Sequence, residues 1–435
     1  MDLNSNNPVA PGTLFAVDGE QHGITGAHFE ELIDAIAEQW VLQQDVSRLL
    51  LIPPDHTRLY SQAGAITAGL WKRLHDRVDI SILPALGTHL PMTPEQLRMM
   101  FGEEIPLDRF LAHNWRTDLE TVGVLPQEFL EELSDGRMRS EVNVAVNRHI
   151  VSGGYDLVLS IGQVVPHEVI GFANHSKNIC IGCGGGEMLH QSHMLGAVCG
   201  IEQVLGVIDT PVRRLVDEGF YRFVSPKADV RFLLTVVTDS AEGPQLRAFT
   251  AGADSECFRW AACISGELNL TRVERPIKKC VVYLDPREFC STWLGNKAVY
   301  RTRKAMADDG ELIVLAPAVD TFGEDQEIDR LIRKHGYRGT PATLDALERD
   351  KDLASNLSAA AHLIHGSTEG RFQVTYCTDS GLSSDEIQEV GYRHRPFQDM
   401  ASEFNVESLS DGWQTGSDGE PFFFIRNPAL GLWSS

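Results

Sequence analysis

Short apolar runs alternate with helix-like segments along much of the chain. The runs at 47–52, 79–86 and 155–162 each have the length and apolar character of a buried strand. Thr93 and Pro94 predict the start of a helix after the second run, because Thr is a common N-cap and Pro a common first helical residue. Strands separated by helices indicate an α/β fold with a largely parallel sheet.

A second unit of the same kind follows in the C-terminal part. The segment 280–284 has the pattern of a strand, 290–308 that of a helix and 311–315 that of another strand. Asp309 and Gly310 form the expected turn between this helix and the last strand. A strand, a helix and a strand in this order are typical of a βαβ unit, so the pattern predicts a second α/β domain.

Chain length and these patterns together predict two domains and a tail. The chain has 435 residues, more than the roughly 100 to 200 residues of a typical domain. We expect an N-terminal catalytic and cofactor-binding domain over 1–275, a C-terminal α/β domain over 276–412, and a tail over 413–435 that docks on the fold. An active site in the cleft between the two domains is expected by analogy with other two-domain enzymes.

Composition and charge exclude several classes of partner. The chain has 38 Lys and Arg against 61 Asp and Glu, a net charge of −23, which repels phosphate backbones and acidic membrane surfaces. No apolar run approaches the roughly 18 residues that a membrane span needs. The eight cysteines are scattered, and the first residues lack the basic and apolar regions of a signal peptide. We therefore expect a cytoplasmic protein that binds neither nucleic acid nor a membrane.

Polar side chains with catalytic chemistry follow each of the three N-terminal strands. Asp55 and Arg58 come after the first, His89 after the second and His167 after the third. Open parallel sheets bind their ligands at the carboxyl ends of strands. Arg can hold a carboxylate through two hydrogen bonds, and His can act as a general base near neutral pH. Each of these residues alone could equally be structural, for example in a turn with a local ion pair.

A fourth segment combines lysine, glycine and histidine. Lys177 is followed by a triple glycine, and a glycine-rich helix start can bind phosphate through backbone N–H groups, although a plain turn explains it equally well. His190 and His193 lie three residues apart on the next expected helix and could ligate a metal. The triple glycine comprises Gly184, Gly185 and Gly186. These segments indicate an enzyme site for a small anion without defining the reaction.

Taken together and in this order, the motifs resemble those of the nickel-dependent lactate racemase family. That family has an Asp-x-x-Arg loop, a Gly-Thr-His turn, a Pro-His dipeptide, a Gly-Phe-x-x-x-x-Lys segment and a downstream His. Here the five motifs are Asp55 with Arg58, Gly87-Thr88-His89, Pro166-His167, Gly171-Phe172 with Lys177, and His193. The likeness covers about residues 45–400. Five ordered motifs are far more specific than any one of them.

The resemblance implies a cofactor and its attachment points. Lys177 is similar to the lysine that forms a thioamide with the nickel-pincer nucleotide, pyridinium-3,5-bisthiocarboxylic acid mononucleotide. His193 resembles the one protein ligand of the nickel, and the triple glycine is expected to hold the nucleotide phosphate. The enzymes that make this cofactor are then expected partners of the protein.

The resemblance also implies how the substrate is held and inverted. His89 and His167 are similar to the acid/base pair on opposite faces of a 2-hydroxy acid, Arg58 with Asp55 to the anchor of its carboxylate, and Lys297 to a further substrate contact. One histidine takes the hydroxyl proton while a hydride moves to the pyridinium carbon, which leaves a planar 2-keto acid. Return of the hydride to the other face, with a proton from the second histidine, inverts the centre. The implied activity is that of an isomerase, a racemase or epimerase.

Two departures from the family pattern concern the substrate. The family usually has two glycines before the lysine, where this chain has Asn174 and His175. It also has a Gln three residues before the C-terminal lysine, where this chain has Leu294 before Lys297. We therefore expect an altered pocket and a preferred substrate other than lactate, because hydrogen-bonding pockets discriminate strongly on such groups.

Two other functions stay open on the sequence. A metal-dependent hydrolase that uses His89, His167, His190 and His193 would bind a metal without a pyridinium chromophore. A non-catalytic protein of the same fold would bind a small anion and be stabilised by it without turnover. The oligomeric state is equally open, and a homo-oligomer is compatible with the sequence.

Overall fold

The computed structural model of the protein describes 12–240, 243–379, 381–429 and 431–435. These residues form two compact units. The N-terminal unit contains the described residues up to Ser192 together with Gly206–Asn269, and the C-terminal unit contains His193–Leu205 together with Leu270–Ser435. The segment 193–205 therefore belongs to the C-terminal unit, although its neighbours in sequence on both sides belong to the N-terminal one. Among the described residues, no helix is long and apolar enough to cross a membrane.

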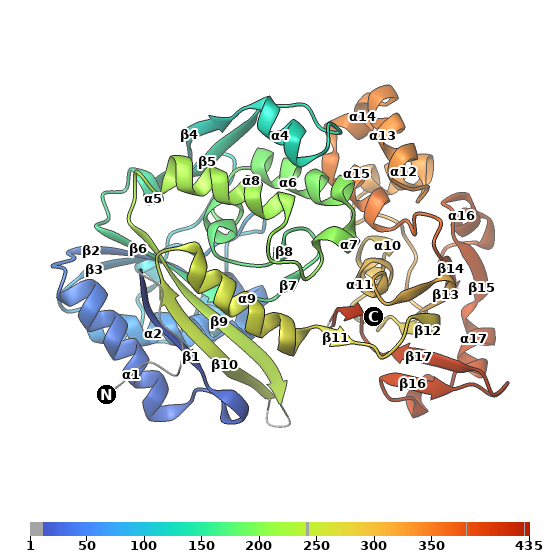
Figure 1. Ribbon diagram of the computed structural model, residues 1–435, viewed down its shortest axis with the longest axis horizontal. Helices are drawn as coiled ribbons and strands as arrows, with labels where there is room; N and C mark the ends of the chain where they lie inside the picture. Colours follow the sequence, from blue (N-terminus) through green and yellow to red (C-terminus); the bar gives the residue numbers. More distant parts are fainter. Residues whose placement is uncertain (1–11, 241–242, 380, 430) are drawn as a thin grey trace. The chain divides into compact units, whose positions relative to one another are not determined.

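A six-stranded sheet lies at the centre of the N-terminal unit, in the order β1-β10-β9-β6-β2-β3 (Figure 1). The neighbours β9-β6-β2-β3 are parallel, whereas β10 is antiparallel to both β9 and β1. The strand bounds are β1 (Thr13–Asp18), β2 (Arg48–Ile52), β3 (Asp79–Ile82), β6 (Leu157–Gln163), β9 (Val230–Ser240) and β10 (Gly243–Gly252). The three predicted N-terminal strands are thus confirmed as β2, β3 and β6. Their expected parallel arrangement is also confirmed.

Helices cover both faces of this sheet. On one face α1 (Gly26–Ile36), α2 (Ala63–Leu74) and α3 (Pro94–Phe101) pack against alternate strand residues, which are almost completely buried there. On the other face α9 (Ser255–Asn269) packs against β9 and β10. Thr93 caps α3 as predicted, since its side chain accepts a hydrogen bond from the backbone N–H of Gln96.

Shorter elements complete the N-terminal unit. Two antiparallel strands, β4 and β5, and a second small pair, β7 and β8, lie outside the main sheet. A π-helix (Asn178–Gly182) precedes α6, whose C-terminal half belongs to the C-terminal unit. The bounds are β4 (Leu119–Leu125), α4 (Gln127–Leu133), β5 (Val142–Asn147), α5 (Arg148–Val151), β7 (Pro166–His167), β8 (Gly171–Phe172), α6 (Gly186–Cys199) and α8 (Pro211–Gly219). Helix α7 (Ile201–Val204), which follows α6, belongs to the C-terminal unit.

The C-terminal unit is built on a second six-stranded sheet, in the order β15-β14-β13-β12-β17-β16. All neighbours are parallel except β16 and β17. The strand bounds are β11 (Thr271–Arg272), β12 (Ile277–Tyr283), β13 (Met306–Ala316), β14 (Gln373–Thr378), β15 (Arg393–Pro396), β16 (Gly412–Thr415), β17 (Pro421–Ile425) and β18 (Trp433–Ser434). The helices are α10 (Thr292–Gly295), α11 (Lys297–Thr302), α12 (Gln326–His335), α13 (Thr340–Arg349), α14 (Lys351–Ser355), α15 (Leu357–His365), α16 (Ser384–Glu389) and α17 (Phe397–Glu403).

The predicted helix over 290–308 is too long. The structure has the two short helices α10 and α11 there, and β13 begins at Met306. Asp309 and Gly310 do not connect a helix to a strand but lie within β13, where the register with β12 shifts. Asp309 has a φ of 59°, in the left-handed region that Asp tolerates better than most residues, so a turn-forming pair here produces a bulge.

The tail is also more than a segment docked on the fold. Its strand β17 pairs in parallel with β12, so it lies inside the second sheet rather than on its surface. Phe424 at the centre of β17 is fully buried and packs with Met400 and Phe404 of the α17 region. The sheet of the C-terminal unit is therefore incomplete without the last residues of the chain.

Replacement of Phe424 by alanine tests this placement. We expect Phe424→Ala to lower the free energy of unfolding by about 3 to 5 kcal/mol, because a buried phenyl ring leaves a cavity. Chemical denaturation followed by circular dichroism measures the change. Met99→Ala removes a side chain that is 68% exposed and serves as the control. Equal, small effects of the two variants would contradict the burial of β17.

Candidate functional site

The expected acid/base residues lie where neighbouring strands of the N-terminal sheet end. Because β6, β2 and β3 are parallel and adjacent, their carboxyl ends share one edge of the sheet. Asp55 follows β2, His89 follows β3 and His167 follows β6. The backbone continues the pairing beyond β2 and β3, since the N–H of Ala85 donates to the carbonyl of Pro53 at 2.8 Å. This pairing brings the loops after β2 and β3 together.

Asp55 and His89 form a hydrogen-bonded pair. Nδ1 of His89 lies 2.6 Å from Oδ2 of Asp55, while the hydroxyl of Thr57 donates to Oδ1 at 2.5 Å. Asp55 is only 4% exposed, whereas the side chain of His89 is 59% exposed. Since a carboxylate can only accept, Nδ1 of His89 carries a proton, and Nε2 of the neutral ring is left with its lone pair.

The charges around this pair shift both pKa values. Burial alone would raise the pKa of Asp55, but the hydrogen bonds from His89 and Thr57 outweigh burial and lower it. The hydrogen bond to Asp55 raises the pKa of His89, against burial and the positive charges of Arg58 and Lys177. Asp55 therefore stabilises the protonated form of His89, as a buried carboxylate does for a catalytic histidine.

Asp55 is hydrogen-bonded to His89 and not to Arg58, although the family resemblance assigns Asp55 and Arg58 together to the substrate anchor. Both carboxylate oxygens are engaged by His89 and Thr57. The guanidinium of Arg58 instead donates to the carbonyl and the hydroxyl oxygen of Thr57, both at 3.3 Å, and the side chain is exposed. Asp55 thus belongs with the proton-transfer residue His89, and Arg58 presents its remaining donors to solvent.

His167 has the opposite tautomer. It lies on β7, and its Nδ1 accepts a hydrogen bond of 3.1 Å from the backbone N–H of Val169. Nδ1 is therefore unprotonated in the neutral ring, and the proton sits on Nε2. The two candidate acid/base residues consequently differ at the reactive atom, because Nε2 of His89 is an acceptor and Nε2 of His167 is a donor.

The segment before Lys177 makes a left-handed turn. Asn174 has a φ of 71° and His175 a φ of 60°, values that glycine adopts without steric cost. Both residues therefore adopt a backbone conformation that favours glycine. The ring of His175 is fully buried, with its centroid 4.0 Å from that of Phe232, and does not line an open pocket. The expectation that His175 alters the substrate pocket is therefore wrong.

Arg213 of α8 holds this turn in place. Its guanidinium donates to the carbonyl oxygens of Phe172 and Asn174 at 2.5 and 3.2 Å and to the hydroxyl of Ser176 at 3.1 Å. Ser176 in turn donates to Asp217, and Arg213 itself is buried. No sequence motif points to Arg213, since its role depends on where α8 packs.

Lys177 is a basic group in an unfavourable environment for charge. Burial, followed by the positive charge of Arg58, lowers its pKa to about 8, although Glu168 acts in the opposite direction. A larger fraction of the amine is thus neutral, and nucleophilic, near neutral pH than for a solvated lysine. The adjacent Asn178 donates to the carbonyl of Ile52 at 3.2 Å and to the hydroxyl of Ser160 at 3.0 Å, which ties this segment to β2 and β6.

Two of the three backbone N–H groups of the triple glycine are already hydrogen-bonded within the protein, so fewer of them can bind an anion than expected. The N–H of Gly184 donates to the carbonyl of Ile181, and the N–H of Gly185 to that of Ala145, both at 3.2 Å. A Cβ on Gly184 would lie 1.8 Å from a backbone oxygen, so close packing alone requires glycine there. Of the three residues, only Gly186, at the start of α6, is left as a candidate phosphate contact.

The remaining predicted residues, His193 and Lys297, belong to the C-terminal unit. His193 is a partly exposed residue of α6, and Lys297 begins α11 with its Nζ 5.5 Å from the ring centroid of Phe289. Close to Lys297 in sequence, the partly exposed Trp293 packs against buried His362, with ring centroids 4.3 Å apart and the rings tilted by 30°. In the described part of the chain, no three His, Cys, Asp or Glu side chains form a group able to hold a metal ion, which the hydrolase alternative requires.

Fold and site together define a two-unit α/β protein with histidines and a buried carboxylate at one edge of its N-terminal sheet. Residues 27–204 match the lactate racemase N-terminal domain. This part of the chain is therefore similar to the N-terminal domain of lactate racemases.

Two solved structures have a similar fold. One is the crystal structure of a protein from Thermotoga maritima, with a TM-score of 0.75 and 23% identity over 96% of this chain and 99% of that chain. The other is the lactate racemase apoprotein from Thermoanaerobacterium thermosaccharolyticum, with a TM-score of 0.67 and 17% identity over 93% of each chain. At these identities the likeness shows the fold alone. No protein of curated function matches this chain.

The Asp55 and His89 pair makes a direct prediction. In Asp55→Asn we expect the pKa of His89, followed by NMR titration, to fall toward the usual value of about 6.5, because the partner carboxylate is lost. Asp55 favours the imidazolium form of His89. The pair therefore stabilises the folded state fully at a pH below the usual histidine pKa, and this stabilisation is lost as the pH rises through the raised pKa of His89. Asp350→Asn, which alters the His335 pair instead, is the control. An unchanged pKa of His89 in Asp55→Asn would contradict the pairing.

Proposed function

We propose that the protein is a racemase or epimerase that inverts C2 of a 2-hydroxy acid and carries a nickel-pincer nucleotide. The observation that carries the proposal is the pair of histidines with opposite tautomers after neighbouring parallel strands, His89 and His167. Inversion needs a proton acceptor on one side of the substrate and a proton donor on the other. Nε2 of neutral His89 can accept a proton, and His167 can donate one from Nε2 once both of its ring nitrogens are protonated.

Residues of this chain fit the cofactor that the family resemblance implies. The lowered pKa of Lys177, about 8, suits an amine that must attack an activated carbonyl or thiocarbonyl carbon to form a covalent link. Imidazole is a suitable nickel ligand, which supports His193 as the protein ligand. Gly186 at the start of α6 is the candidate contact for the phosphate. When bound, the cofactor would accept and return a hydride, chemistry that no side chain offers.

Arg58 is the proposed anchor of the substrate carboxylate. Its guanidinium is exposed, and its positive charge acts on both His89 and Lys177, which places the three groups in one electrostatic environment. Bidentate binding of a carboxylate by Arg orients the substrate as well as holding it. Lys297 is proposed as a second contact from the C-terminal unit.

His89 is the proposed base in the resting protein. Its Nε2 has a lone pair for the hydroxyl proton, and Asp55 stabilises the imidazolium that results. His167 holds a proton at Nε2 and can donate it to the substrate oxygen on the other side. Full transfer of that proton leaves a neutral ring only if Nδ1 is protonated first, which sacrifices the hydrogen bond from Val169. The two histidines are therefore not equivalent, and the two directions should have different pH profiles.

The preferred substrate is proposed to differ from lactate. Leu294 occupies the position at which the family has Gln, so one polar contact to a substrate is lost. Trp293 beside it packs against His362, whose Nε2 lies 3.0 Å from the hydroxyl of Tyr337. Apolar groups at these positions favour a substrate that does not need the missing hydrogen bond.

The isotope at C2 provides the test of the reaction class. The protein, produced together with the cofactor's biosynthetic enzymes, is given enantiopure 2-hydroxy acids that carry deuterium at C2. We expect the opposite enantiomer to form with its deuterium retained, because the hydride leaves and returns without exchange with water. Loss of deuterium to solvent would contradict hydride transfer. Stabilisation by the acids without inversion would favour the anion-binding alternative.

Substitution of His89 separates proton transfer from cofactor binding. We expect His89→Gln to lower the rate of inversion by about 10² to 10⁴, the usual contribution of a general base, with cofactor loading unchanged. His190→Gln is the matched control, because this histidine has no proposed role. An effect of similar size in the two variants would contradict the assignment of His89.

A further inference from the structure

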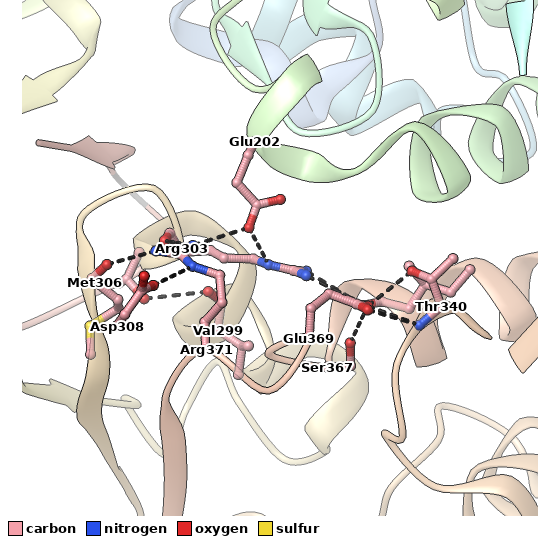
Figure 2. A network of polar contacts seen from close by, with 11 residues as sticks. Glu202, Val299, Arg303, Met306, Asp308, Thr340, Ser367, Glu369 and Arg371 are labelled. Carbon is pink, nitrogen blue, oxygen red and sulfur yellow. Dashed lines mark hydrogen bonds and ion pairs between the residues drawn. The ribbon is translucent and has the colours of Figure 1, made fainter. Parts of the chain in front are cut away.

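Helix α7 is held within the C-terminal unit by a partly exposed ion-pair network around the buried Arg303 (Figure 2). Oε1 of Glu202 lies 2.8 Å from Nε of Arg303 and accepts a hydrogen bond of 3.2 Å from Nη1 of Arg371. Arg303 is 1% exposed, and its second carboxylate partner, Glu369, lies 3.7 Å away. A buried guanidinium between two carboxylates is strongly disfavoured when one of them is removed.

The two arginines are held by contacts that do not involve Glu202. Arg371 donates to the carbonyl oxygens of Arg303 and Met306 at 3.2 and 3.0 Å and to Asp308 at 2.8 Å. On the other side, Glu369 accepts hydrogen bonds from the backbone N–H of Thr340 and the hydroxyl of Ser367. Figure 2 shows Glu202 reaching from α7 toward this group of side chains. Glu202 therefore contacts two arginines whose other partners also lie in the C-terminal unit.

Apolar packing fixes α7 as well. Ile201 and Leu205 form a buried cluster with Tyr300 and Leu432 of the C-terminal unit. The Nζ of Lys304 donates to the carbonyl of Leu205 at 3.1 Å. The ion pairs and this cluster act on the same short helix, so its position in the unit is defined by both.

The same segment contains the proposed nickel ligand. His193 lies in the C-terminal half of α6, and only the turn at Gly200, with a φ of 88°, separates α6 from α7. At the other end of α6, Glu187 accepts hydrogen bonds from the backbone N–H and the side chain of Asn143, at 2.9 and 2.7 Å, in the N-terminal unit. The first half of α6 is thus held within the N-terminal unit, and its second half belongs to the C-terminal unit.

We propose that Glu202 is a positioning residue for His193. Through Arg303 and Arg371 it fixes the segment 193–205 in the C-terminal unit, and with it the imidazole that would bind nickel. The inference rests on the proposed function. Neither Glu202 nor the arginines carry a family motif, and their role follows from the packing alone.

The test compares Glu202→Gln with Glu369→Gln in the cofactor-loaded protein. Both variants remove one negative charge next to Arg303, but only Glu202 lies on α7. We expect Glu202→Gln to release nickel to a chelator about tenfold faster than the wild type, as loss of an outer partner of a metal ligand does. Nickel X-ray absorption should show less imidazole coordination, with the denatured mass adduct at Lys177 unchanged. Glu369→Gln should resemble the wild type in all three measurements.

Hydrogen–deuterium exchange on the same samples distinguishes the remaining outcomes. We expect faster exchange over 193–205 in Glu202→Gln only. Unchanged nickel release and exchange in Glu202→Gln, or equal acceleration in both variants, would overturn the proposal. A wild-type protein without adduct would overturn the proposed function instead, and the exchange data would still show whether Glu202 anchors the segment.

Discussion

The parallel pairing of β2 with β3 and β6 is the constraint on which the candidate site depends. It places the loops after three strands at one edge of the N-terminal sheet, and the continued backbone pairing of Pro53 with Ala85 brings Asp55 within hydrogen-bonding distance of His89. An antiparallel neighbour would send one of these loops to the opposite edge. The packing of apolar helices on both faces holds the sheet, so the chemistry of the edge rests on an ordinary apolar core.

Three groups near this edge of the sheet, His89, His167 and Lys177, have protonation states that are set by different surroundings. Asp55 raises the pKa of one histidine, a backbone N–H fixes the tautomer of the other, and burial lowers the pKa of Lys177 to about 8. Each shift has a separate physical cause, yet Arg58 influences both His89 and Lys177. The site is therefore better described as one coupled set of charges than as independent residues.

Sequence patterns predicted the strands and the residues after them, because buried strands and catalytic types of side chain are local features. They did not predict the partner of Asp55, which lies 34 residues away in the chain and depends on strand order. The roles of Arg213 and Glu202 were not predicted for the same reason, since both side chains contact segments that are distant in sequence. The left-handed turn at Asn174 and His175 could not be predicted because neither residue is glycine. The position of β17 inside the sheet could not be predicted because a short aromatic run is equally typical of a docked tail and of a central strand.

The central claim is that Lys177 carries a covalently bound nucleotide cofactor, and the denatured mass of the intact protein tests it most directly. Wild type, Lys177→Ala and, as a control for loss of a lysine, a variant of the exposed Lys227, Lys227→Ala, are produced with the cofactor's biosynthetic enzymes. We predict a nucleotide-sized mass increase in the wild type and Lys227→Ala and none in Lys177→Ala. A wild type without the increase, under conditions that load a lactate racemase, or an increase that persists in Lys177→Ala, would contradict it.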